Sequence, residues 1–383
     1  MNNLVIICAI LLLVLLFLKV PVYIAVLSAS AVYFIGTPGM NLSIFAQKTI
    51  SGAEGLSLLA IPFFVCAGIF MNYTGVTKRI MNCCEVLTAR MPGGLAQVNI
   101  LLSTLMGGLS GSSLADAAMQ CKMLVPTMES KGYSKSFSTV ITAASGMVVP
   151  LIPPGVGLII YGCINNISIG KLFIAGIGPG IVFCVTLMIF THFLSKKRGY
   201  LPSRTTKIPV SEKIAAVRPA FLPLLLPIII IGGVRIGVFT ASEAGTVAIV
   251  YAVLLGLLYK ELTLKNVMQG CKETVTTTAS IMLIVAAATC FSWILTKEQI
   301  PQFSQWMISN IHNKYVFLIM VNIFLLIVGM FIEGNASMIV LAPLLHPVAM
   351  AYGIDDIHFA MVYIFNCTIG AFTPPMGTLM FVS

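Results

Sequence analysis

The sequence is poor in charge. Only 9% of its 383 residues are Asp, Glu, Lys or Arg, whereas 58% are hydrophobic, and the mean hydropathy is +1.01. About a quarter of the residues in an ordinary globular domain are charged, because a water-soluble surface requires them. Long apolar runs recur from end to end of the chain. Composition therefore excludes a soluble domain with a single anchor and predicts a polytopic protein in a lipid bilayer.

The sequence also lacks the motifs of several other functions. Its ten cysteines form no Cys-x-x-Cys pair and lie at no zinc spacing from histidine, so we read them as small buried hydrophobic residues. There is no Walker A pattern, no HExxH and no GxSxG. We therefore expect no ATP-driven pump, no enzyme and no bound cofactor. The net charge of +10 lies in short clusters between apolar segments, which argues against a nucleic acid partner.

Two of the apolar segments, 95–128 and 315–349, are too long for one membrane span and carry polar residues in the middle. We predict that each is a re-entrant hairpin of two helical arms, which is tolerated at membrane depth only where it is buried in protein or lines a cavity. The other segments are expected to be ordinary or broken spans. They cover residues 4–18, 20–37, 56–73, 136–163, 172–195, 219–237, 240–259, 275–296 and 358–383.

The longest polar stretch, 196–218, divides the chain. It holds seven Lys or Arg residues against one acid, Glu212, so the positive-inside rule predicts a cytoplasmic loop. The predicted organisation is a first half, 1–195, with hairpin 95–128 and broken helix 136–163. The second half, 219–383, contains hairpin 315–349 and broken helix 358–383.

The two halves repeat one another. A single constant offset in residue number relates Pro126 to Pro347, Gly132 to Gly353, Pro153 to Pro374 and Pro154 to Pro375. Prolines and glycines in register, with matched hydropathy, indicate an internal duplication. In a membrane protein two such halves are usually inverted repeats, with substrate and ion sites at their interface. The predicted fold class is an all-α polytopic membrane protein of two inverted repeats, each with a re-entrant helical hairpin and a broken transmembrane helix, as in secondary transporters.

The second half ends sooner than the first. Residues 163–195 follow the first broken helix, whereas Ser383 comes eight residues after Pro375. By the logic of the repeat, we expect the counterpart to continue for roughly 30–40 residues, and we read the chain as a truncated form.

The middle of each predicted hairpin carries polar residues suited to ion binding. Ser110–Ser113 combines a flexible glycine with hydroxyl and carbonyl oxygens, and Asp116 follows one turn later. An unwound tip exposes carbonyls that can ligate sodium, while the returning arm offers a positive helix N-terminus to an anion. The alternative is a seam of small residues for close helix packing. In the second hairpin, Glu333 could ligate a cation, accept a proton, or only brace the turn.

Each predicted broken helix contains a pair of prolines. Pro153-Pro154 and Pro374-Pro375 remove amide donors and interrupt their helices, leaving free carbonyls on one side and a new N-terminus on the other. Such a break can supply carbonyl ligands to sodium and amide donors to a carboxylate. The alternative is a simple kink. Ser145 and Asn366 occupy matching places before the breaks, and we expect them to face the cavity.

At these motifs the sequence resembles a known family. It is similar to the large permease subunit of tripartite ATP-independent periplasmic (TRAP) transporters over essentially its whole length. The stretches that carry the resemblance are 50–54, 59–64, 108–118, 152–157 and 171–176, read as ISGAE, LAIPFF, GLSGSSLADAA, IPPGVG and KLFIAG.

The resemblance implies a sodium-coupled symporter of organic acids in a bacterial inner membrane. Its implied partners are a small TRAP membrane subunit and a periplasmic substrate-binding protein, and its implied mechanism is an elevator. Sodium, the coupling ion, is expected at Ser110, Gly111, Ser112, Ser113, Val149, Pro150, Glu333, Gly334, Asn335, Ser337, Gly370 and Thr373. Substrate is expected at Ser113, Asp116, Ser145, Pro153, Pro154, Asn366, Pro374 and Pro375.

One alternative function stays open within the same architecture. A sodium-dicarboxylate carrier could work without a binding protein, and a requirement for a soluble binding protein in uptake would distinguish the two. A passive channel would show flux without sodium.

Overall fold

The structure is a computed structural model that describes residues 3–18, 20–204, 206, 208–298, 311, 313–374 and 377–382. Within these ranges every regular element is a helix. Those of the first half are α1 Asn3–Phe17, α2 Val22–Gly36, α3 Leu42–Ser51, η1 Leu56–Leu59, α4 Ala60–Tyr73, α5 Val76–Thr88, α6 Gly94–Ser110, α7 Ser113–Ser130, α8 Lys135–Gly146, η2 Val149–Leu151, α9 Val156–Asn165 and α10 Ile169–Lys197. Those of the second half are α11 Val210–Ile236, α12 Ala241–Leu258, α13 Leu264–Lys297, α15 Lys314–Gly329, α16 Gly334–Ala351, α17 Asp356–Phe372 and α18 Thr378–Val382.

The helices confirm a polytopic membrane protein. Five of them, α10, α11, α12, α13 and α16, are long and apolar enough to cross a bilayer, and two bent helix pairs bring the total to as many as seven spans among the described residues. At most 44% of the residues in the most apolar stretch of each are buried within the protein. The other residues of these stretches are at least partly exposed at the protein surface, as side chains that contact lipid would be.

The first predicted hairpin segment forms two helices, α6 and α7, joined by a short tip. α6 ends at Ser110, and Gly111 takes the left-handed conformation, with φ of 63°. Its N–H donates to the carbonyl of Gly107, which closes the end of α6. Ser112 then caps α7 by accepting a hydrogen bond from the N–H of Ala115. The Gly/Ser sequence thus ends one helix and starts the next within two residues.

The first broken helix follows the hairpin. α8 and η2 together are bent by 41° relative to α9, across a break of four residues at 152–155 that contains Pro153-Pro154. The break was predicted from the two prolines. A second bend, of 69°, separates α4 from α5. No double proline marks this bend, and the sequence analysis missed it.

The second half contains matching elements. The offset that relates the paired prolines also carries both ends of α7 onto the ends of α16, and the start of α8 onto the start of α17. The tip between α15 and α16 lies at Met330–Glu333, and α17 ends just before Thr373-Pro374. Pro375 lies outside the described residues. The inverted relation of the halves and the boundaries between them remain predictions.

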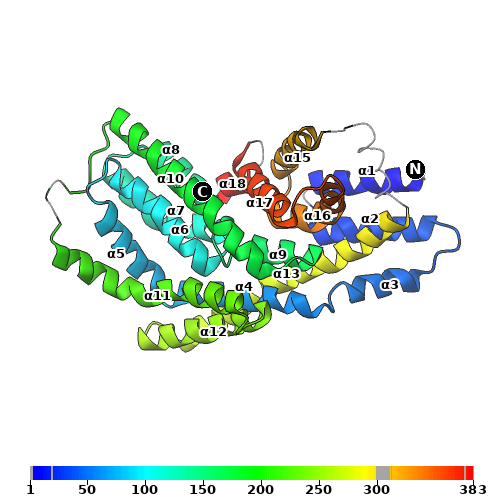
Figure 1. The fold of residues 1–383 in the computed structure, drawn as a ribbon, viewed down its shortest axis with the longest axis horizontal. Coiled ribbons are helices and arrows are strands. Elements are labelled where there is room, and N and C mark those ends of the chain that lie inside the picture. The colour runs from blue at the N-terminus through cyan, green and yellow to red at the C-terminus, as the bar shows by residue number, and fades with distance from the viewer. Residues whose placement is uncertain are drawn as a thin grey trace.

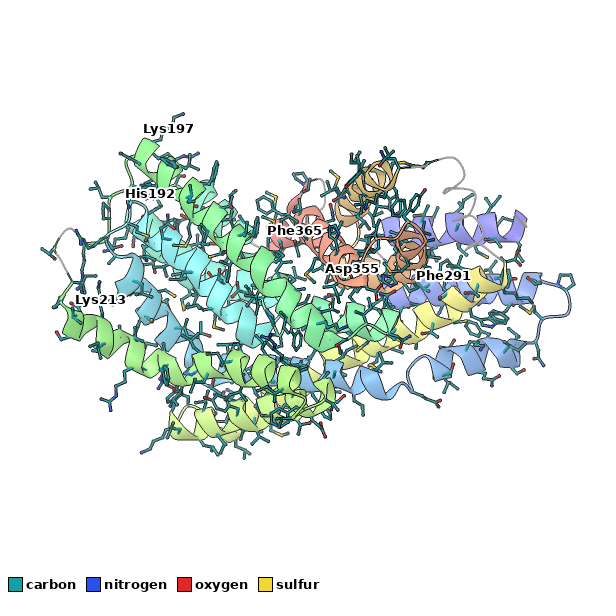
Figure 2. All side chains as sticks on the ribbon, in the orientation of Figure 1. His192, Lys197, Lys213, Phe291, Asp355 and Phe365 are labelled. Carbon is teal, nitrogen blue, oxygen red and sulfur yellow. The ribbon has the colours of Figure 1, made fainter. Side chains whose placement is uncertain are left out.

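Two polar regions differ from their predicted form. Lys78 and Arg79, which lie between the predicted segments 56–73 and 95–128, belong to helix α5. About half of the basic stretch 196–218 is helical, because α10 continues to Lys197 and α11 begins at Val210. Only residues 198–209 connect the two. Figure 2 shows Lys197 and Lys213 toward the same end of the molecule, so the helix ends gather positive charge at one end.

The two halves pack against each other rather than forming separate bodies. α10 contacts both α6 and α17, α9 contacts α16, and α18 contacts α7 and α8. Figure 1 shows α9 and α10 running between the first hairpin and the group α15–α18. α13 packs along α2 and α4, and α12 covers α4. The hairpins and the broken helix therefore lie against a wall formed by α4 and α13.

Helices α15 and α17 cross at a pair of glycines. A Cβ built on Gly329 would lie 2.8 Å from the Cα of Gly370, closer than real Cβ atoms approach. We predict that Gly329→Ala separates the two helices and destabilises the protein by about 1–3 kcal/mol. The measurement is thermal unfolding of the purified protein in detergent.

The control is Gly178→Ala in α10, where a Cβ would meet nothing within 4 Å. This substitution should leave the unfolding temperature unchanged or slightly raised. Equal effects of the two substitutions would contradict the close crossing.

Candidate functional site

The tip of the first hairpin is held between α4 and the break in the first broken helix. The N–H of Val156, the first residue of α9, donates to the carbonyl of Gly111 at 3.3 Å. A Cβ on Gly111 would lie 2.9 Å from the carbonyl oxygen of Pro154. On the other side, a Cβ on Gly68 of α4 would lie 2.6 Å from the carbonyl oxygen of Ser110. The tip is therefore fixed through backbone atoms at positions where only glycine fits.

The tip of the second hairpin is closed by Glu333. This residue is the N-cap of α16, and its Oε2 accepts a hydrogen bond from the N–H of Ala336 at 3.0 Å. Glu333 thus braces the turn with one oxygen. Ser337 is buried one turn later, and its carbonyl accepts a hydrogen bond from the hydroxyl of Tyr363 on α17 at 3.1 Å.

The two tips meet at a pair of adjoining cavities. The larger has a volume of about 370 Å³ and the smaller about 40 Å³. Both are lined by Ser113, Pro150, Glu333 and Asn335. Residues far apart in the sequence therefore share one site. The predicted site residues that line it are Ser110, Gly111, Ser112, Ser113, Pro150, Glu333, Gly334 and Asn335.

The remaining predicted residues line neither cavity. Pro153 and Pro154 stand in the break, against the glycines of α6 and its tip. Thr373 ends α17, and its hydroxyl donates to the carbonyl of Ile369. Those that are absent from the two linings are Asp116, Ser145, Val149, Pro153, Pro154, Ser337, Asn366, Gly370, Thr373 and Pro374.

Asp116 lies in a buried hydrogen-bond network between α6, α7 and α8. Its Oδ2 accepts hydrogen bonds from the hydroxyl of Ser103 at 2.7 Å and from Nε2 of Gln120 at 2.8 Å. The hydroxyl oxygen of Ser103 also lies 2.9 Å from that of Ser145, and the Ser145 hydroxyl lies 3.1 Å from Oδ1 of Asn99, both within hydrogen-bond distance. These side chains tie both arms of the hairpin to the broken helix.

Asn366 makes the corresponding link in the second half. Its Nδ2 donates to Oδ1 of Asn322 on α15 at 2.6 Å. Ser145 and Asn366, which the repeat places in equivalent positions, therefore both join a broken helix to the first arm of its hairpin. The sequence did not reveal Asn99, Ser103, Gln120 or Asn322 as members of these networks. The one sequence feature that could have identified these four residues is that each is a polar side chain within an apolar segment.

The opposite wall of the larger cavity comes from α4 and α13. It includes Asn72, Glu273 and Thr277, none of which was singled out from the sequence. Glu273 fell just outside the predicted span 275–296, whereas α13 begins at Leu264 and includes it. Its position, two residues before a long apolar segment, could have marked Glu273 as a candidate, because acids are rare there.

The charge and the helix ends at the cavity suit two kinds of ligand. Three helices, α7, α9 and α16, begin at residues that line it or adjoin them, and a helix N-terminus favours an anion. The charged lining residues are Glu273 and Glu333, and no Lys, Arg or His is among the described residues that line either cavity. Among the described residues no three His, Cys, Asp or Glu side chains gather as for a transition metal. Carboxylate, hydroxyl and carbonyl oxygens instead suit a hard cation.

Comparison with known proteins agrees with this architecture. The family model of the tripartite ATP-independent periplasmic transporter, DctM component, matches residues 9–383. The fold resembles the crystal structure of the Alcanivorax borkumensis YdaH transporter, with a TM-score of 0.59 and 11% identity over 89% of this chain and 80% of that one.

Curated relatives carry related names. The sialic acid TRAP transporter large permease protein SiaM of Vibrio cholerae is 41% identical over 96% of this chain and 86% of its own length. The C4-dicarboxylate TRAP transporter large permease protein DctM of Pseudomonas aeruginosa is 36% identical over 88% and 79%. The chain therefore belongs to the DctM component family of tripartite ATP-independent periplasmic transporters, which are transport proteins of the inner membrane and not enzymes.

Proposed function

We propose that this chain carries a small organic acid across the inner membrane by sodium-coupled symport, as the large permease subunit of a tripartite transporter. The observation that carries the proposal is the meeting of both hairpin tips and Pro150 in one cavity. Sodium would bind at the tips, and the organic acid would bind between them.

Sodium suits the tips because their ligands are oxygen atoms. The Ser110–Ser113 tip offers backbone carbonyls and hydroxyl groups, and the second tip offers Glu333 and Asn335 beside the cavity. Oε2 of Glu333 accepts a hydrogen bond from the N–H of Ala336, and Glu333 lines the cavity in which a cation would bind. A bound cation would offset the negative charge of Glu333 and of an incoming organic acid. This offset is the physical basis of the proposed coupling.

The substrate class follows from the helix ends and from the relatives. The N-termini of α7, α9 and α16 can donate amide hydrogen bonds to a carboxylate. The names of relatives include sialic acid, C4-dicarboxylate and 2,3-diketo-L-gulonate, the last from an Escherichia coli permease 36% identical to this chain. A dicarboxylate or a sugar acid is the proposed substrate.

The proposed cycle is of the elevator type. The hydrogen bonds of Ser145 and Asn366 join each hairpin to its broken helix, which supports a transport unit that moves as one body. The wall of α4 and α13 would be the fixed surface. The proposed partners are a small membrane subunit and a periplasmic substrate-binding protein, as the family implies.

Sodium binding can be tested without knowledge of the substrate. We predict that sodium, but not potassium at equal ionic strength, raises the unfolding temperature of the purified protein. At a tenfold excess over Kd the gain in free energy of unfolding is about 1.4 kcal/mol. Ser112→Ala and Asn335→Ala should reduce or abolish the gain, because each removes an oxygen ligand at one tip.

The control is Ser130→Ala at the other end of α7, where the hydroxyl donates only to the carbonyl of Thr127. This variant should respond to sodium like the parent protein. A well-folded parent protein with no preference between the two ions would refute the sodium sites and favour a proton-coupled carrier or a passive pore.

The tripartite assembly has its own test. Cells that express the chain with its small subunit and binding protein should take up a labelled organic acid, tested as sialic acid, a sugar acid and a C4-dicarboxylate. Removal of the binding protein should reduce uptake at least tenfold. Undiminished uptake without it would instead favour the sodium-dicarboxylate carrier that works alone.

A further inference from the structure

Glu273 is held in a fixed orientation on the α13 wall of the larger cavity. Its Oε1 accepts two hydrogen bonds, from the hydroxyl of Tyr73 at 2.7 Å and from Nε2 of Gln269 at 2.8 Å. The second oxygen, Oε2, has no hydrogen-bond partner among the described residues. A carboxylate with one oxygen anchored and the other available resembles the way ligands are oriented around bound metal ions, where neighbouring donors fix the ligating group.

Two further oxygen-bearing side chains line the cavity together with Glu273. Asn72 belongs to α4, and Thr277 lies one turn after Glu273 on α13. Neither side chain has a hydrogen-bond partner within the described part of the chain. Residues four apart on a helix share a face, and α4 packs directly on α13 (Figure 1). The wall thus presents a carboxylate, an amide and a hydroxyl to the space in front of the hairpin tips.

The charge of the cavity favours a cation at this wall. Glu273 and Glu333 both face a space of about 370 Å³, and its lining within the described ranges includes no Lys, Arg or His. The one ion pair among the described residues, Arg204 with Glu212, lies elsewhere. A cleft lined by one sign of charge raises the local concentration of the opposite ion. An anionic substrate alone would be repelled from this wall.

We propose that Glu273, with Asn72 and Thr277, forms a cation subsite that captures sodium on the α4–α13 wall before the ion reaches the hairpin tips. The inference rests on the proposed sodium coupling and adds a site on the wall to those at the tips. A single carboxylate with neutral oxygens suits a monovalent ion, and water in the cavity can complete the ligand shell.

A purely structural role for Glu273 makes a different prediction. If the carboxylate only joined α13 to Tyr73 of α4, its loss would lower the unfolding temperature equally in sodium and in potassium. If it ligates sodium, its loss must raise the sodium concentration that gives half of the stabilising effect. The concentration dependence therefore separates the two roles.

The experiment is a sodium titration of the unfolding temperature, with potassium keeping ionic strength constant. Glu273→Gln keeps the size of the side chain and removes its charge. It should raise the half-saturating sodium concentration at least threefold. Thr277→Val, a milder change at an exposed position, should raise it about twofold, and this serves as the second test if Glu273→Gln does not fold.

Glu261→Gln is the matched control, because it removes the same charge from an exposed residue outside the cavity. It should leave the half-saturating concentration unchanged. If the parent protein responds to sodium but Glu273→Gln and Thr277→Val match the control, the wall subsite is wrong while the sodium coupling stands. If the parent protein itself shows no sodium response, both proposals fail.

Discussion

The need to satisfy backbone hydrogen bonds at membrane depth governs the centre of this protein. A tip between two helices leaves amide and carbonyl groups without partners, and lipid offers none. Here the carbonyl of Gly111 accepts from Val156 at the start of α9, and Glu333 accepts from Ala336 at the start of α16. One interrupted helix thus supplies the hydrogen-bond partner for the end of another, and α16 is capped by its own Glu333. The carbonyl and amide groups at these helix ends are also the kind of groups that can bind ions.

Buried polar side chains link these interrupted helices to their neighbours by hydrogen bonds, one group of helices in each half. Asp116, Ser103, Gln120 and Ser145 connect three helices of the first half, and Asn322 with Asn366 connects two of the second. A hydrogen bond in an apolar interior is costly to leave unmade, so a relative shift within either unit would be unfavourable. The proposed elevator motion would therefore leave each unit intact.

The sequence predicted those features that depend on local chemistry. Ser110–Ser113 and Pro153-Pro154 have few conformational options in an apolar segment, so the tip and the break could be placed within a few residues. Glu333 was identified because an acid is rare in such a setting. The repeat pattern and the hairpin motif placed Asp116, Ser145 and Asn366 near the centre, but which neighbours they contact is decided by tertiary packing.

Other features had no local signal. The bend between α4 and α5 was missed, and so was the amphipathic helix α5 with Lys78 and Arg79. This charged stretch lies between the apolar segments 56–73 and 95–128, and hydropathy alone assigns it no span. The guanidinium of Arg79 in fact lies 3.7 Å from the ring of Tyr259, and its Nη1 donates to the carbonyl of Gly75. Glu273 was missed because its importance comes from the cavity it faces, and the cavity is assembled from distant parts of the chain.

The glycine of α4 beside the first tip has a mechanical consequence. Gly68 presents no side chain, so the carbonyl of Ser110 rests on a bare stretch of helix backbone. Interlocked side chains must change rotamer or unpack before two surfaces can slip, and this contact contains none at that point. A Cβ at position 68 would lie 2.6 Å from that carbonyl oxygen, so any residue larger than glycine would force the tip away from α4.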